Sequence, residues 1–286
     1  MGYQIITDSC CDYPQQMYED LGLKEVALTV RFRGEETNRY SEAWLKEMYD
    51  GLRKGEAATT AAVNPEIWAE AIESVLQKGE DVLALAFSSG LSTTYQSAVI
   101  AANDLKEKYP ERKVYVVDTL CASLGQGLFV YYAARKRQEG MDLEALHSWC
   151  LENRLKLCHW FTVDDLMYLK RGGRVSAATA LVGTMLNIKP VLHVDDEGHL
   201  INIGKTRGRK ASIQALADKM GELGIPGAND TVFICHGDCM EDAKYLESLV
   251  RERYGVKEVL IYYTGAVIGS HSGPGTLALF FLDKHR

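Results

Sequence analysis

The 286-residue sequence contains no apolar run long enough to span a membrane. No stretch approaches the roughly 18 apolar residues that a spanning helix requires. The segment from Met1 to Ile6 has neither the basic start nor the long apolar region of a secretion signal, and Ile6 does not fit the myristoylation pattern. We therefore expect a cytoplasmic protein without an integral membrane segment.

Positive charge is scarce as well, because 32 Lys and Arg residues face 39 Asp and Glu residues and the net charge is -7. We do not expect nucleic acid or an anionic membrane to be the principal partner of such a chain. The seven cysteines include no Cys-x-x-Cys pair, which suits a reducing compartment better than a disulfide framework. We expect most of them to be small buried hydrophobic residues and no metal site at Cys235 and Cys239.

The motifs of nucleotide-binding proteins and serine hydrolases are also missing. Residues 198–206 end in Gly-Lys-Thr, but five residues separate the glycines where a phosphate-binding loop requires four. Residues 269–273 place histidine at the centre of a possible nucleophile elbow, and residues 86–90 lack its first glycine. An esterase or thioesterase that uses Ser92 and His271 stays an alternative, because these residues could meet only in three dimensions.

A regular alternation of short β-rich runs and longer helical runs marks the first half of the chain. A helix that begins at Pro65 and stops at Gly79, for example, leads into a buried strand at 81–87. This alternation predicts α/β layers with a mainly parallel sheet. The other expected β-rich runs are 3–9, 24–32 and 113–118, and the other expected helices are 12–22, 93–109, 125–140 and 142–156.

The pattern changes beyond a predicted strand at 157–163. Two short runs at 191–194 and 200–203 flank the turn Asp195-Asp196-Glu197-Gly198, which predicts a β-hairpin and a mixed sheet. We place the boundary between two α/β domains near residue 158, giving domains 1–158 and 159–286 with a ligand cleft between them. We expect helices at 164–187 with an interruption at Gly172-Gly173, at 209–224 and at 240–254, and strands at 231–235, 257–263 and 277–282.

Two small-residue segments could bind an anion. Residues 88–97 leave a predicted strand and enter a predicted helix, and a helix N-terminus offers free N–H groups and partial positive charge. Ordinary capping by serine or threonine explains this segment equally well. In residues 269–275 glycines surround His271, which lets the backbone approach a ligand and the imidazole donate to a carboxylate. A plain turn with a hydrogen-bonded histidine is the alternative there.

Taken together, the motifs resemble the DegV family, whose members bind fatty acids and include the acyl-binding subunits of bacterial fatty acid kinase. The resemblance implies two α/β domains with an acyl chain in a tunnel between them. It implies that Thr60, Ser92 and His271 hold the carboxylate, supported by loop residues Ser89, Gly90, Thr93, Gly269 and Gly273. The matching elements are residues 6–9, 88–97, 117–119, 122–127, 169–175, 189–190 and 269–275.

The chain departs from the family pattern in two places. Thr60-Ala61-Ala62-Val63 stands where Thr-Ser-Gln-Pro is common, and Thr93 stands where glycine is usual. The resemblance implies a protein without a cofactor that is not itself an enzyme and presents a long-chain fatty acid to an ATP-dependent kinase subunit. Among two basic clusters, at 170–174 and 205–210, it favours Arg174 and Arg207 as contacts of that partner or of the acyl phosphate. Solvated helix ends are the other explanation of these clusters.

Overall fold

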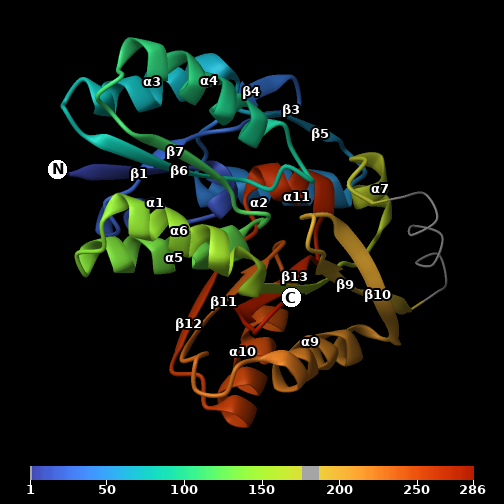
Figure 1. The fold of residues 1–286 in the computed structure, drawn as a ribbon. Helices are drawn as coiled ribbons and strands as arrows, with labels where there is room; N and C mark the ends of the chain where they lie inside the picture. The colour runs from blue at the N-terminus through green and yellow to red at the C-terminus, as the bar shows by residue number, and fades with distance from the viewer. Residues whose placement is uncertain (1, 176–186) are drawn as a thin grey trace.

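The computed structural model describes residues 2–175 and 187–286. A four-stranded, all-parallel sheet in the order β2-β1-β6-β7 forms the centre of the first domain (Figure 1). Every residue of β6 is buried, which explains why this strand is a continuous apolar run rather than an alternating one. The strands are β1 (Tyr3–Asp8), β2 (Lys24–Val26), β6 (Asp81–Ala86) and β7 (Val114–Asp118).

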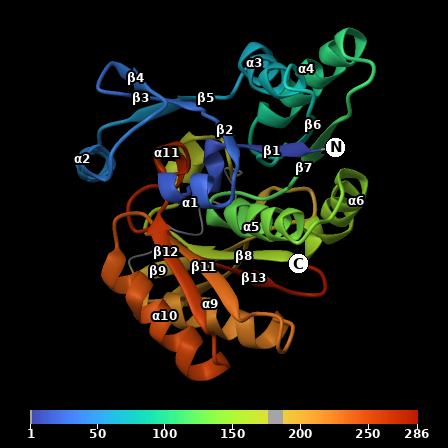
Figure 2. The same cartoon turned by 90° about the vertical axis from the view of Figure 1, so that its left-hand side faces the viewer.

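Helices cover both faces of this sheet. The outer layer contains α3 (Pro65–Leu76) and α4 (Thr94–Lys108). The inner layer contains α1 (Gln15–Asp20), α5 (Leu124–Gln138) and α6 (Leu143–Asn153), and Figure 2 shows α5 between the two main sheets. Because α5 also packs on β8, β11 and β13 of the other sheet, it is apolar around most of its circumference.

The second domain is built on a six-stranded mixed sheet in the order β10-β9-β8-β13-β11-β12. Only β11 and β12 are parallel neighbours in it, so the expectation of two α/β domains, the first parallel and the second mixed, is confirmed. Its outer face is covered by α9 (Arg209–Leu223) and α10 (Met240–Tyr254) (Figure 1). The strands are β8 (Leu157–Thr162), β9 (Ile188–Val194), β10 (Leu200–Arg207), β11 (Thr231–His236), β12 (Glu258–Tyr263) and β13 (Leu277–Leu282).

The expected single β-rich run at 24–32 is wrong, because two strands of different sheets share it. After β2, the N–H of Leu28 donates to Ser9 Oγ at 3.0 Å, so the chain leaves the parallel sheet at this point. The strand β3 (Thr29–Phe32) then pairs with β4 (Glu35–Thr37) and β5 (Ala58–Ala61) in a small antiparallel sheet beside α2 (Glu42–Arg53). The sequence pattern does not predict this small sheet.

The segments 269–275 and 164–187 differ from what the sequence predicts. The glycine-rich segment at 269–275 is not all loop, because α11 (Ala266–Ser272) continues through its first half. Gly269 fits inside that helix because it packs on Tyr49, whose Oη would lie 2.3 Å from an added Cβ. The helix predicted at 164–187 is observed only as α7 (Met167–Arg171), and residues 176–186 lie outside the described part. No helix in the described residues has the length and apolarity needed to cross a membrane.

Candidate functional site

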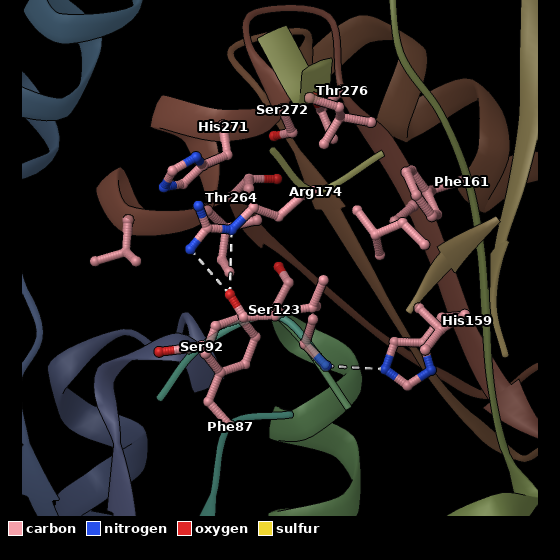
Figure 3. Close-up of a pocket in the computed structure, with 18 of the residues that line it drawn as sticks. Phe87, Ser92, Ser123, His159, Phe161, Arg174, Thr264, His271, Ser272 and Thr276 are labelled. Carbon is pink, nitrogen blue, oxygen red and sulfur yellow. Dashed lines mark hydrogen bonds between the residues drawn. The ribbon is translucent and has the colours of Figure 1, made fainter. Parts of the chain in front are cut away.

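A cavity of about 430 Å³ lies between the two domains and is lined by residues from both. This volume falls in the range of small-molecule sites, roughly 300–1,000 Å³. Figure 3 shows Ser92 and His271 on one side of the cavity and His159 and Phe161 on the other. The apolar side chains that line it are Leu28, Ala62, Phe87, Leu91, Ala122, Phe161, Leu169, Val194, Leu200, Val267, Ile268, Ala278 and Phe280.

Thr60 and His271 meet at one end of this cavity. Thr60 lies on β5, where it lines the cavity while its neighbours Thr59 and Ala61 are exposed on the opposite face of the strand. His271 lies in α11, and its Nε2 is 2.7 Å from Thr60 Oγ1. The structure therefore brings together two of the three residues that the resemblance implied, although 211 positions separate them in the chain.

The His271 imidazole is held in a defined position and a defined charge state. Burial, and secondarily the nearby Arg174 charge, lower its pKa to about 4, so the ring is neutral at pH 7. Gly172 packs against the other ring nitrogen so closely that a Cβ at this glycine would lie 2.3 Å from Nδ1. The neutral ring and the Thr60 hydroxyl form a hydrogen-bonded pair that can offer a donor to an oxygen in the cavity.

Ser92 lies in the turn that joins β6 to α4 and also lines the cavity. Its Oγ accepts the N–H of Thr94 at 3.2 Å and lies 2.9 Å from Thr94 Oγ1. Ser92 thus precedes Thr93, the N-cap of α4, and it both accepts a backbone N–H at the start of this helix and lines the cavity. Ser89 and Thr93 line the cavity too, whereas Gly90, Gly269 and Gly273 are not among its lining residues.

Arg174 enters the cavity wall, and Arg207 does not. The guanidinium of Arg174 donates to the Leu91 carbonyl from Nε at 3.1 Å and from Nη2 at 2.9 Å, and it also donates to the Gly172 carbonyl. Burial lowers its pKa, yet the group stays charged and places positive charge beside His271. Arg207 is exposed at the end of β10 and is not part of the lining.

The sheet of the second domain forms the floor of the cavity. Cys235, Ala278 and Phe161 are lateral neighbours on β11, β13 and β8. His159 and Phe280 form the next row on the same face, two residues further along their strands. His159 is fully buried with its pKa well below the usual value, mainly because of burial, and its Nε2 accepts the Ala122 N–H at 3.1 Å. Among the described residues that line the cavity, Arg174 alone has a charged side chain, and it lies beside His271.

Several polar residues of the cavity wall were not predicted from the sequence. Ser123 has a left-handed backbone (φ 55°, ψ -149°), which residues other than glycine rarely adopt, and its hydroxyl donates to the buried Asp12. Thr264 and Ser272 also line the cavity, and the Ser272 hydroxyl has no hydrogen-bond partner among the described residues. Ser123 belongs to the 122–127 motif, which was a usable signal. Ser272 likewise lies in the 269–275 segment, whereas Thr264 gave no signal, because only folding brings it to the cavity.

The hydrogen bonds of this site do not support the esterase alternative. Ser92 is bonded to Thr94 and His271 to Thr60, so neither residue engages the other as nucleophile and base. Within the described residues, no group of three or more His, Cys, Asp or Glu side chains could hold a metal ion. All cysteines except Cys239 are buried. The arrangement is that of a binding cavity with polar donors at one end.

Comparison with known proteins agrees with this arrangement. The sequence model of the DegV family, described as uncharacterised protein, matches residues 3–284. A DegV domain-containing protein from Clostridium perfringens is 46% identical over 282 residues, covering 98% of this chain and 97% of that protein. The fatty-acid-binding DegV family protein from Thermus thermophilus has a TM-score of 0.88 at 33% identity, covering 99% and 100% of the two chains. A DegV lipid-binding protein from Thermotoga maritima has a TM-score of 0.87 at 30% identity and complete coverage of both chains.

Proposed function

The chain belongs to the DegV family, and from this premise and the cavity we propose that it binds a long-chain fatty acid between its two domains. The single observation that carries the proposal is the polarity of the cavity. Its walls are largely apolar, whereas Thr60, Ser92, His271 and Arg174 gather hydroxyl, imidazole and guanidinium groups at one end. An acyl chain with a terminal carboxylate has the same distribution of polar and apolar groups.

The energetics favour such a ligand. Each methylene that leaves water contributes about 0.8 kcal/mol, so a long acyl chain supplies most of the binding free energy. A carboxylate, by contrast, must not be buried without partners. In the proposed pose Thr60, Ser92 and His271 bind the carboxylate, and the Arg174 charge attracts it. The apolar rows around Phe161 and Phe280 surround the chain.

We further propose that the protein presents this carboxylate to a partner kinase that forms an acyl phosphate. The chain itself has no nucleotide-binding motif, so the phosphoryl chemistry belongs to an ATP-dependent partner. Arg174 beside the head group, and Arg207 exposed on β10, are the proposed contacts of that partner or of the phosphate. This chain then contributes orientation and needs no cofactor of its own.

Mass spectrometry of lipid extracted from the purified protein tests fatty acid binding. We expect a fatty acid in the extract, and we expect delipidated protein to take up a long-chain fatty acid at one site per chain. Protein that neither carries nor takes up a fatty acid would refute the proposal. For the kinase role, incubation with candidate kinase subunits and ATP should yield acyl phosphate only when the loaded protein is present.

A further inference from the structure

The tip of the β9–β10 hairpin, which belongs to the second domain, touches the turn that carries Ser92 in the first domain. Ser88 Oγ donates to the carbonyl of Gly198 at 2.9 Å, and both groups are buried in this contact. The conformation of the hairpin turn is fixed by hydrogen bonds, because Asp195 Oδ1 accepts the N–H groups of Glu197 at 3.0 Å and His199 at 2.8 Å. A preformed turn of one domain is therefore bonded to the head-group turn of the other.

Two glycines make this contact possible. Gly198 has a φ of +78°, and a Cβ at this position would lie 2.1 Å from Ser88 Oγ. On the other side, a Cβ at Gly90 would lie 2.8 Å from the carbonyl oxygens of Glu197 and Gly198. The two backbones approach each other at a distance that leaves no room for a side chain on either turn.

The contact is connected directly to Ser92. The Ser88 carbonyl accepts the N–H groups of Leu91 and Ser92, both at 3.1 Å, and Ser88 Oγ accepts the N–H of Gly90 at 3.2 Å. A displacement of Ser88 therefore moves Ser92. The far side of the same turn is tied to the second domain as well, since Arg174 donates twice to the Leu91 carbonyl.

We propose that the hairpin tip is a positioning element of the carboxylate site, in which Gly198 and Ser88 set the place of the Ser92 hydroxyl. The inference rests on the proposed binding of a fatty acid. In this scheme Ser92 contacts the ligand. Gly198 and Ser88 do not, since neither is among the residues that line the cavity. The expected consequence is a role in recognition of the head group and none in burial of the acyl chain.

The test compares palmitic acid with hexadecanol, which has the same chain length and an uncharged head. Displacement of a fluorescent fatty acid is measured for the wild type, Ser88→Ala, Gly198→Ala and the double variant. We expect each single variant to bind palmitic acid about tenfold more weakly. This is the effect of losing one charge-assisted hydrogen bond, the one between Ser92 and the carboxylate. Hexadecanol affinity should stay within about twofold, since burial of the chain is unchanged.

The double variant and a matched glycine variant separate positioning from general damage. Ser88→Ala removes the oxygen that a Cβ at residue 198 would meet, so the effect of Gly198→Ala should be smaller in that background. Gly227→Ala is the control, because Gly227 has a similar φ of +76° and no atom within 4 Å of its added Cβ. It should leave the affinities for both ligands unchanged.

An acid-to-alcohol affinity ratio that stays at the wild-type value in Ser88→Ala would overturn the inference, even if Gly198→Ala fails to fold. The same conclusion follows if Gly227→Ala lowers the ratio as much as Gly198→Ala does. Wild-type protein that binds no palmitic acid would instead refute the proposed function, and this inference with it. The wild-type measurement thus distinguishes the two failures.

Discussion

At the scale of single residues, the site depends on polar side chains placed where an apolar cavity ends. Thr60 and His271 satisfy each other at 2.7 Å, and Ser92 is satisfied by Thr94. Because the hydroxyls of Thr60 and Ser92 already have partners within the protein, neither of them is left without a hydrogen bond. A carboxylate can accept from the same groups without any of them changing its charge.

Replacing Ser92 and His271 together by alanine should weaken fatty acid binding by about 100-fold. Each substitution removes one hydrogen bond to the charged carboxylate, worth about 1.5–3 kcal/mol, and leaves the apolar walls intact. Titration of delipidated protein measures the change. Thr59→Ala is the control, because this exposed threonine lies beside Thr60 on the same strand. Equal affinities of the double variant and the wild type would remove these residues from the proposed site.

The sequence was enough to predict Ser92 and His271 as site residues, but not the other polar residues around them. Ser92 and His271 lie in small-residue segments that stand out in any reading of the chain. Contact of Arg174 with a partner or with the acyl phosphate stays a prediction, and in the structure its hydrogen bonds to the Leu91 carbonyl place it in the cavity wall. Thr264 occupies an unremarkable position after a strand. Its place in the cavity depends on packing between segments far apart in the chain.

At the scale of elements, the site is assembled from the end of a strand, a helix and two turns. Strands such as β6 were predictable because burial on both faces produces a continuous apolar run. The small sheet of β3, β4 and β5 was not, because its strands have three or four residues and are partly exposed. Nor was the helical nature of α11, in which Gly269 allows close packing against Tyr49 of α2 rather than a turn.

The contact between α7 and α11 predicts an effect of Gly172→Ala. The new methyl group would overlap His271 Nδ1, so the imidazole has to leave its present position beside Thr60. Overpacking of this kind costs about 1–3 kcal/mol, and we expect fatty acid affinity to fall by about tenfold. Gly204→Ala on β10 is a suitable control, since no atom lies within 4 Å of its added Cβ. An unchanged affinity for Gly172→Ala would show that the position of His271 does not matter.

At the scale of the whole molecule, the buried carboxyl group of Asp12 lies where the two domains meet. Asp12 bonds Ser123 at the start of α5, the helix between the sheets, and burial raises its pKa to about 7 despite that bond and the Gly265 amide. Burial likewise raises the pKa of Asp8 to about 6. Both carboxyl groups keep a proton in the folded state at pH values where the unfolded chain has lost it.

This linkage predicts a pH dependence of stability. A folded pKa above the usual 3.8 means that the native state binds more protons between about pH 4 and pH 7, so the free energy of unfolding falls as pH rises through that window. In Asp12→Asn, which keeps an acceptor for Ser123, the fall should be smaller by at least about 1.4 kcal/mol, the value of one pKa unit. Denaturant titrations of both proteins at pH 4.5 and pH 8 measure it. Equal falls in both proteins would contradict the raised pKa of Asp12.

The division of the molecule near residue 158 stays a prediction, although β8 begins the second sheet at Leu157. Its functional meaning is that neither domain has a complete site. Thr60 and Ser92 come from the first domain, whereas His271 and Arg174 come from the second. A ligand that contacts residues of both domains stabilises the folded arrangement of the two domains by mass action.

The most direct test of the central claim is a crystal structure of the protein loaded with a single long-chain fatty acid. Continuous density should run through the cavity between the domains, with the carboxylate within hydrogen-bond distance of Thr60, Ser92 and His271 and the methyl end toward His159 and Phe280. An empty cavity at full loading would contradict the account. So would a chain in the opposite direction, with its carboxylate among the apolar rows of the second sheet.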